Sequence, residues 1–343
     1  MIKYNFQNDY SEGAHPRIIE ALAKSNLIQE VGYGEDRFSL SAIERIRAAA
    51  GNPQADIHLV SGGTQANALV LDSFLRPFES VIAVDSGHIC VHETGAIEAT
   101  GHKINAVKGR DGKITPEEIQ AVVDEHYFEH MVKPRAVYIS QSTEVGTIYS
   151  AKEMRELSVL CKKFNLILYV DGARLGCGLT SSKSDLDLKE LSSLVDVFYI
   201  GGTKNGALIG EAIVINNPLL KPEFRYCIKQ HGALLAKGRL LGIQFDELFK
   251  DNLFYDLARH ANSSAESLVG GISKLGYGFL FDSPTNQIFP IFPNRVIEKL
   301  NESYLFYVWS KVNADNSSVR LVTSWATPEQ AVKDFLQDLA ALS

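Results

Sequence analysis

The sequence predicts an α/β protein with a large, mainly parallel sheet and a smaller C-terminal α/β lobe. Short apolar runs alternate with longer amphipathic runs over most of the chain, a pattern typical of parallel strands covered by helices. The 343 residues can bury one large and one smaller core, and the composition, 45% hydrophobic and 22% charged, is that of a globular protein. We therefore expect an N-terminal segment over residues 1–14, a large domain over 15–244 and a small domain over 245–343.

Six short segments rich in β-branched and aromatic residues are the predicted strands of the large sheet. In chain order they are DIHLV (56–60), SVIAV (80–84), RAVYIS (135–140), LILYV (166–170), DVFYI (196–200) and EAIVI (211–215). Several are followed by Gly, Asp or Ser. Ligands of open α/β sheets bind beyond the carboxyl ends of the strands, so we expect the functional residues at these endings.

Four helix starts are marked by a Ser or Thr three residues before Glu or Gln, because this spacing lets both side chains bond first-turn N–H groups. The capping sequences are SAIE from Ser41, TPEE from Thr115, SAKE from Ser150 and TPEQ from Thr327. From about residue 245 the pattern changes to helical stretches, the Pro-rich FDSPTNQIFPIFPN (281–294) and a short strand, SVRLVTS (318–324). This change marks the predicted small domain.

The charge balance argues against nucleic acid and anionic membranes as partners. There are 34 Lys and Arg residues against 41 Asp and Glu residues, a net charge of −7, and no basic run interrupts this balance. No segment approaches the roughly 18 apolar residues of a membrane span, and the first residues lack a signal-peptide pattern. Four scattered cysteines without CxxC spacing fit reduced thiols, so we expect a cytoplasmic protein without disulfides.

A strand, a Gly pair and a helix start follow one another at SGGTQAN (61–67). Unpaired N–H groups and the positive end of a helix dipole would meet there, which is typical of a phosphate site. An ordinary tight turn capped by Thr64 explains the stretch equally well. The segment lacks the GK[ST] ending of a P-loop and the GxGxxG fingerprint, which weakens a nucleotide-binding interpretation.

Two charged residues follow predicted strands. Asp171 comes directly after LILYV, and Lys204 lies in GGTKNG, just after DVFYI. One crossover unit separates them, so neighbouring strand ends would bring them together. The alternatives are an Asp171 that pairs with nearby Arg174 and a Lys204 on a surface turn. A phosphate cradle, a buried carboxylate and a strand-end lysine are together the contacts that pyridoxal phosphate requires.

These motifs resemble those of the L-threonine aldolases, which are fold-type I pyridoxal phosphate enzymes of the β-eliminating lyase group. The resemblance covers nearly the whole chain in order, through NDYSEGAHP (8–16), YGED (33–36), SGGTQAN (61–67), DSGHICVHETGA (85–96), QSTEVGT (141–147), VDGARLG (170–176), GGTKNG (201–206) and VRLVTSWAT (319–327). It implies a seven-stranded large sheet and the retro-aldol cleavage of threonine or allo-threonine to glycine and acetaldehyde. It also implies a homotetramer built from two dimers.

The resemblance assigns the cofactor contacts to individual residues. It implies that Lys204 bonds pyridoxal phosphate covalently, that Asp171 pairs with the ring nitrogen, and that Gly63 and Thr64 hold the phosphate. His88 matches the histidine that stacks over the cofactor ring in this family.

The substrate contacts are assigned in the same way. Arg174 and Arg320 match residues that bind the substrate α-carboxylate, for which an arginine fork is suited. Arg174 is also expected to contact the cofactor. Where the better-known RSDT motif offers a serine to that carboxylate, this chain has Gln7, whose amide can still donate a hydrogen bond. Tyr33 is expected to act across a dimer, and Lys229 to reach the phosphate region, although interface packing explains both residues as well.

The base that removes the proton from the β-hydroxyl group is open between His88, Glu144 and a water. Glu144 stands at or near the place of a histidine in the ENTHN stretch of many family members, and it can serve if its pKa is raised, but a plain loop carboxylate fits equally well. His88 and His92 have the spacing of a metal pair. The HExxH pattern fails at Ala96 and no third ligand is obvious, so we expect no metal site.

Other functions use the same motifs. A pyridoxal phosphate-dependent β-eliminating lyase or an aminotransferase needs the same Lys204 and Asp171, and the sequence does not display the geometry that separates these reactions. A non-catalytic protein that binds pyridoxal phosphate would be expected to lack Lys204 or the arginines that bind the substrate carboxylate. This chain has all of them. A nucleotide-dependent oxidoreductase could use SGGTQAN with Asp85 on the ribose, but it would leave Lys204 and Asp171 without a role.

Overall fold

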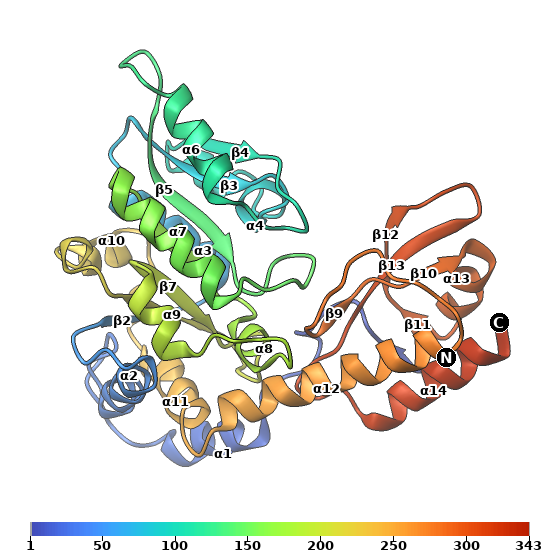
Figure 1. The fold of residues 1–343 in the computed structure, drawn as a ribbon. Coiled ribbons are helices and arrows are strands. Elements are labelled where there is room, and N and C mark those ends of the chain that lie inside the picture. The colour runs from blue at the N-terminus through green and yellow to red at the C-terminus, as the bar shows by residue number, and fades with distance from the viewer. Residues whose placement is uncertain (1, 343) are drawn as a thin grey trace.

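The computed structural model describes residues 2–342, which form two α/β units joined by a long helix (Figure 1). The large unit is built on a seven-stranded sheet in the order β2-β8-β7-β6-β5-β3-β4. Its strands are β2 (Asp56–Val60), β3 (Glu79–Val84), β4 (Ile104–Val107), β5 (Lys133–Ser140), β6 (Ile167–Asp171), β7 (Val197–Gly201) and β8 (Glu211–Ile215). All neighbours are parallel except β8, which runs antiparallel to β2 and to β7. The predicted mainly parallel α/β sheet is confirmed.

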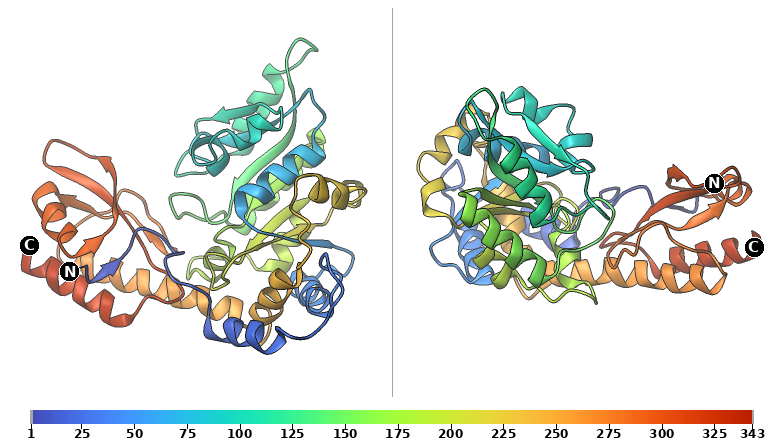
Figure 2. Two further views of the ribbon diagram at one scale, coloured as in Figure 1. Left: turned by 180° about the vertical axis from the view of Figure 1, so that it is seen from behind. Right: turned by 45° about the horizontal axis from the view of Figure 1, so that its top comes forward.

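Helices cover both faces of this sheet (Figures 1 and 2). They are α1 (Pro16–Ser25), α2 (Arg37–Ala50), α3 (Gly63–Phe74), α4 (His88–Val91), α5 (Ala96–Ala99), α6 (Pro116–Glu125), α7 (Ala151–Phe164), α8 (Leu175–Thr180), α9 (Leu188–Leu194), the 3₁₀ helix η1 (Pro218–Leu220), α10 (Phe224–Gln230) and α11 (Arg239–Leu248). Because both faces are covered, alternate residues of β6 enter different cores. Leu168 and Val170 pack with α2, α7 and α9, whereas Ile167 and Tyr169 pack with α3 and α10.

The predicted helix starts are partly confirmed. Thr115 and Ser150 each form the complete capping box. The start predicted at Ser41 is wrong, because Asp36 already caps α2, with its Oδ1 accepting the N–H of Ser39 at 2.9 Å. Both signals are present in the sequence, and the one further upstream begins the helix.

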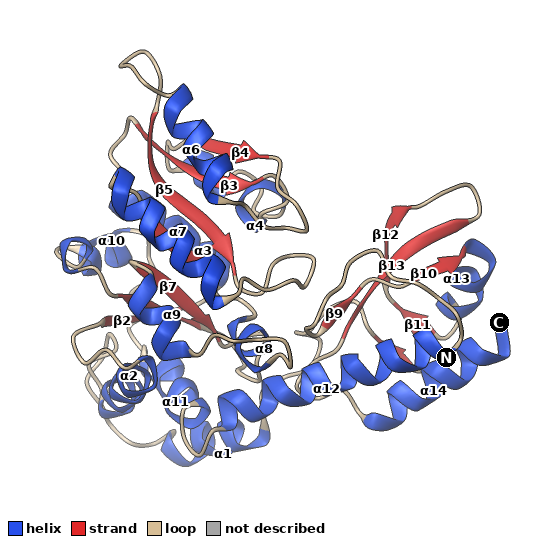
Figure 3. Ribbon diagram, viewed as in Figure 1, coloured by secondary structure: helices blue, strands red, loops and turns tan. Residues whose placement is uncertain are grey.

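The smaller unit contains both ends of the described chain (Figures 1 and 3). Its elements are β1 (Tyr4–Asn5), β9 (Gln287–Ile288), β10 (Ile291–Pro293), α13 (Asn294–Asn301), β11 (Tyr304–Leu305), β12 (Tyr307–Lys311), β13 (Asn316–Val322) and α14 (Glu329–Leu342), and α12 (Leu253–Lys274) leads into it. β13 pairs antiparallel with β9, β10 and β12, and β1 pairs in parallel with β11. α14 begins two residues after the predicted start at Thr327.

One edge of the large sheet faces the smaller unit (Figure 1). The carboxyl ends of β2, β5, β6 and β7 meet there, and so does the first residue of β8, because that strand runs in the opposite direction. This is the edge at which the sequence places the functional residues. None of the helices within residues 2–342 has the combined length and apolarity that a membrane crossing requires.

Candidate active site

Asp171 is the last residue of β6, the middle strand of the sheet, and its side chain is buried. The hydroxyl group of Tyr138 donates to its Oδ2 at 2.6 Å, and that of Tyr199 donates to its Oδ1 at 2.6 Å. The backbone N–H of Ala173 also donates to Oδ1, at 2.9 Å. These bonds satisfy the carboxylate within the protein and fix its direction, as a buried charge requires.

Arg174 does not pair with Asp171, so that alternative interpretation is wrong. Its Nε and Nη2 donate to the two oxygens of Asp9 at 2.7 and 3.0 Å, and Asn286 donates to the same carboxylate at 3.0 Å. Burial alone would raise the pKa of Asp9, but the charges of Arg174 and Lys204 outweigh burial and hold it low. The pair joins the N-terminal segment to the start of α8 and leaves Nη1 of Arg174 outside the Asp9 fork.

Lys204 lies in the turn that follows β7, where the N–H groups of Gly202 and Thr203 both donate to the carbonyl of Gly210. Lys204 forms no salt bridge with any residue in the described chain. Burial, followed by the positive charge of Arg174, lowers the pKa of its amine. A lowered pKa favours the uncharged, nucleophilic amine.

Seven of the predicted residues share one cavity. Its volume is about 310 Å³, and the residues of the prediction that line it are Gly63, Thr64, His88, Glu144, Asp171, Arg174 and Lys204. The interpretation of Lys204 as a surface-turn residue is therefore wrong. The cavity lies at the edge where the strands end, as expected for an α/β sheet.

The Gly pair of SGGTQAN lies at the N-terminus of α3. Gly62 is the N-cap residue, and no side chain caps the helix, so Thr64 does not have the capping role that the alternative interpretation gave it. A Cβ atom on Gly63 would lie 2.9 Å from the hydroxyl oxygen of Tyr199. A side chain at this position would displace a buried phenol that is bonded to Asp171, which favours glycine. Gly62, Gly63 and Thr64 line the cavity, and no side chain accepts the first-turn N–H groups of the helix.

His88 is held by a hydrogen-bonded chain that reaches Asp171. Its Nδ1 lies 2.8 Å from Oε1 of Glu93. The amide of Asn67 donates to the same Glu93 oxygen at 2.7 Å and to Oδ2 of Asp171 at 3.2 Å, and Tyr169 donates to the Asn67 carbonyl at 2.7 Å. Glu93 and Asn67 were not predicted as site residues, although both lie inside motifs that the sequence singled out.

Glu144 is half-buried and is not a plain loop carboxylate. Its Oε1 accepts the backbone N–H of His88 at 3.0 Å and the hydroxyl of Ser140 at 2.6 Å. Its Oε2 is buried without a hydrogen-bond partner, and so is the Oγ of Ser142, which lines the same cavity. Burial raises the pKa of Glu144. Two unpartnered buried oxygens at one cavity indicate a polar ligand.

Arg320 reaches this region from β13 of the smaller unit but does not line the cavity. Its Nη2 donates to the backbone carbonyl of Gln7 at 3.1 Å, and its Nε is buried without a partner. Its guanidinium lies over the rings of Tyr307 and Trp309, 5.5 and 5.6 Å from their centroids. Gln7 thus contributes its carbonyl group, and its predicted side-chain bond to a substrate stays a prediction.

Tyr33 lies apart from the cavity of its own chain. It is 43% exposed, and Nζ of Lys229 lies 4.7 Å from its ring centroid. Its predicted contribution across a dimer stays a prediction.

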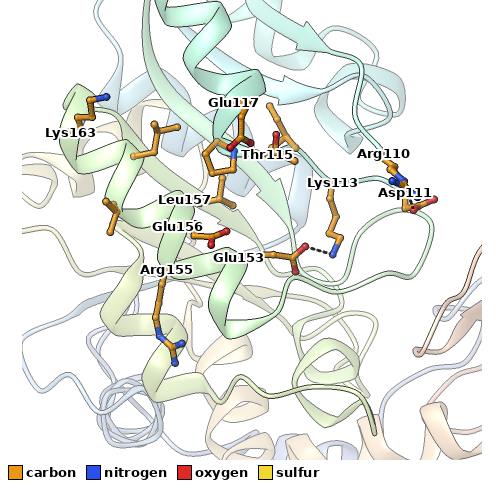
Figure 4. A pocket seen from close by; sticks show the side chains of 14 residues that line it. Arg110, Asp111, Lys113, Thr115, Glu117, Glu153, Arg155, Glu156, Leu157 and Lys163 are labelled. Atoms are coloured by element: carbon orange, nitrogen blue, oxygen red, sulfur yellow. Dashed lines mark hydrogen bonds and ion pairs between the residues drawn. The ribbon is translucent and has the colours of Figure 1, made fainter.

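A larger cavity lies elsewhere, between α6 and α7, and has a volume of about 850 Å³ (Figure 4). Charged side chains line it, among them an ion pair of Lys113 with Glu153 at 2.6 Å, and it contains none of the predicted site residues. Size alone does not identify the functional site.

The rings of His88 and His92 lie 5.5 Å apart, and no three potential metal ligands gather anywhere in residues 2–342.

Comparisons with known proteins agree with this geometry. The family model described as beta-eliminating lyase matches residues 6–291. A low specificity L-threonine aldolase of Pseudomonas sp. (strain NCIMB 10558) is 32% identical over 98% of this chain and 97% of its own length, and that of Pseudomonas aeruginosa is 31% identical over 97% and 96%.

Solved structures give the same result. A threonine aldolase structure from Leishmania major has a TM-score of 0.98 and 46% identity, with 99% of each chain covered. A variant of Thermus thermophilus aspartate aminotransferase has a TM-score of 0.74 at 14% identity, covering 100% of this chain and 92% of its own, and it shares the fold alone. The predicted fold class, that of fold-type I pyridoxal phosphate enzymes, is confirmed. The chain belongs to the beta-eliminating lyase family.

Proposed function

We propose that the protein is a pyridoxal phosphate-dependent L-threonine aldolase, which cleaves L-threonine or L-allo-threonine to glycine and acetaldehyde. The observation that carries this proposal is the meeting of Lys204 and Asp171, from neighbouring strand ends, in one cavity that also contains the unpartnered Oε2 of Glu144. The likeness to threonine aldolases over nearly the whole chain supports it.

The cavity fits pyridoxal phosphate. The uncapped N-terminus of α3 at Gly63 and Thr64 suits the phosphate, and the glycine leaves room that a Cβ atom would take. Asp171, oriented by two phenols, suits a protonated ring nitrogen, and Lys204 would hold the cofactor covalently. When bound, pyridoxal phosphate supplies an electron-accepting ring that stabilises the charge left at Cα when the Cα–Cβ bond breaks.

The substrate α-carboxylate is bound by arginine in this proposal. Arg320 offers a buried Nε without a partner, and Arg174 offers the Nη1 that the Asp9 fork leaves aside. Because two guanidinium groups fix the position of the substrate α-carboxylate, they also orient the β-hydroxyl group of the substrate.

The β-hydroxyl proton passes to Glu144. The pKa of Glu144 is raised toward the working pH, where a general base is most effective. Its Oε2 has no hydrogen-bond partner in the described chain. His88, whose ring is held by Glu93, donates its backbone N–H to Oε1 of Glu144 and so keeps the Glu144 carboxylate in place.

We also propose a cytoplasmic homotetramer of two dimers. Tyr33 and Lys229 would serve a neighbouring active site, and apolar side chains near Tyr33 in the chain are exposed, with Leu27 at 92% and Val31 at 63%. Exposed apolar groups of this kind are typical of protein interfaces.

The alternative is a β-eliminating lyase or an aminotransferase, because these enzymes share the fold and the same lysine and carboxylate. Purified protein with bound cofactor should release acetaldehyde from L-threonine or L-allo-threonine, detected with alcohol dehydrogenase and NADH. Pyruvate from serine, with no acetaldehyde from either isomer, would favour elimination instead. A Lys204→Ala variant should lose activity by roughly 10³-fold or more, because it removes the covalent attachment, and full activity of that variant would overturn the mechanism.

A further inference from the structure

Glu211 is a carboxyl group of the cavity that the proposed mechanism does not use. It is the first residue of β8, and its Cα is paired with those of Val60 and Gly201, the last residues of β2 and β7. Because β8 runs antiparallel to both neighbours, its first residue lies at the edge where theirs end. The residue is 5% exposed.

The contacts of Glu211 place it beside the predicted phosphate cradle. Its Oε2 accepts the backbone N–H of Gly202 at 3.0 Å. It lines the same cavity as Ser61, Gly62 and Gly63, which directly follow its strand partner Val60. A phosphate held at the N-terminus of α3 would therefore have this carboxyl group as a neighbour.

The cavity has too few free cations to neutralise an ionised Glu211 in addition to a bound phosphate. The cations that line it are Lys204 and Arg174, and Arg174 already pairs with Asp9. Glu211 interacts electrostatically with Lys204 after β7, with Asp171 at the end of β6, and with the phenols of Tyr199 and Tyr169. The other titratable groups that line the cavity are Tyr10, His88, Glu144 and Arg174. β2 and the first turn of α3 contribute no charged side chain to the cavity.

Burial raises the pKa of Glu211 to about 8; the charge of Lys204 opposes this and that of Asp171 adds to it. Near neutral pH the group is therefore protonated before any ligand arrives. A phosphate dianion nearby would raise the pKa further, since like charges disfavour ionisation.

We propose that Glu211 holds a proton whenever a phosphate ester lies at the N-terminus of α3. At a pH at which Glu211 of the ligand-free protein is ionised, the binding of the phosphate is therefore accompanied by the uptake of one proton from solvent. The proposal rests on the proposed function, because it assumes that the phosphate belongs to pyridoxal phosphate. The proton stays on Glu211 and no bond of the ligand is broken. The carboxyl group is then a neutral neighbour of the phosphate rather than a repelling charge.

The test uses the full-length chain, freed of cofactor, and 4-deoxypyridoxine 5-phosphate, which has no aldehyde and cannot bond Lys204. The ratio of dissociation constants, wild type over Glu211→Gln, should be near 1 at pH 7 and about 30 at pH 9.5, because each pH unit above a pKa of about 8 costs the wild type tenfold in affinity. 4-Deoxypyridoxine, which lacks the phosphate, should give no such rise. Glu98→Gln, at an exposed position of α5, is the matched control and should behave as wild type.

Calorimetry in buffers of different ionisation enthalpy gives a second measurement that needs no variant. Both ligands carry the same ring nitrogen, so the difference between them isolates the phosphate. At pH 9 the wild-type chain should take up close to one proton more per 4-deoxypyridoxine 5-phosphate than per 4-deoxypyridoxine. Equal pH dependence of wild type and Glu211→Gln, or equal proton uptake with the two ligands, overturns the proposal. A chain that cleaves threonine but takes up no proton refutes only this inference, whereas proton uptake without any aldehyde release refutes only the aldolase function.

Discussion

His88 and Glu93 form a hydrogen-bonded pair, with Nδ1 of the imidazole 2.8 Å from Oε1 of a carboxylate whose side chain has no exposed surface. The same oxygen accepts the amide of Asn67, which also donates to Asp171. The histidine predicted to lie over the cofactor ring and the carboxylate predicted to hold its nitrogen are thus joined through two side chains, Glu93 and Asn67.

Replacing Glu93 by Gln should lower kcat/KM on L-threonine by about 10- to 100-fold, because a hydrogen bond to a charged group is worth roughly 1.5–3 kcal/mol. The variant should still bind cofactor, since Asp171 keeps its two phenol donors. Steady-state kinetics and the absorption spectrum measure the two effects. A variant as active as Glu98→Gln would show that Glu93 does not position His88.

Replacing Asp171 by Ala should lower the free energy of unfolding of the cofactor-free chain by about 2–4 kcal/mol, because the buried hydroxyls of Tyr138 and Tyr199 each lose their acceptor. Urea unfolding measures this change. Adding Tyr138→Phe and Tyr199→Phe to the variant should recover part of the loss, since no buried donor is then left unpaired. No recovery in the triple variant would contradict this cause.

Replacing Glu144 by Gln should lower kcat by about 10²- to 10⁴-fold, the usual contribution of a general base. In the wild type, activity should fall as the pH drops through the pKa of Glu144, because the base must be ionised, and burial places that pKa above the ordinary value. The pH profile of kcat/KM checks the sign. An acid limb that survives unchanged in the Gln variant would transfer the role to His88 or a water.

Replacing Arg320 by Lys should raise KM for L-threonine by about tenfold or more, because an ammonium group cannot reproduce the fork of a guanidinium on a carboxylate. The same change at Arg110, whose side chain is 94% exposed, should leave KM unaltered. Initial rates over a range of threonine concentrations measure both. An unchanged KM in Arg320→Lys would remove Arg320 from the substrate contacts.

The sequence predicted six of the seven strands of the large sheet, because five- or six-residue apolar runs with turn residues behind them are a strong local signal. The strand it missed is β4, whose four residues INAV lie at the sheet edge with a side chain exposed at Ala106. An edge strand of this length has too few apolar residues to stand out. The helix start at Ser41 was misplaced because two capping signals stand five residues apart and packing decides between them.

The residues at the strand ends were predictable because a strand, its ending and the next helix are consecutive in the chain. Asp171 ends its strand, and Gly63 and Lys204 follow theirs within a short turn, and parallel strands bring such endings to one edge. The direction of β8 cannot be read from EAIVI, because an apolar run looks the same in either direction. Glu211 was therefore missed as a member of the site.

What the sequence by itself determined is the fold class and the place of Gly63, Asp171 and Lys204 at the carboxyl edge, since both depend on local pattern and strand order. Only the tertiary structure decided which partners those groups have. Arg174 binds Asp9, 165 positions away, rather than the neighbouring Asp171, because Asp171 is already satisfied by two phenols from adjacent strands. The antiparallel course of β8 likewise brings Glu211 to the predicted phosphate site, because strand direction is set by the packing of the whole sheet.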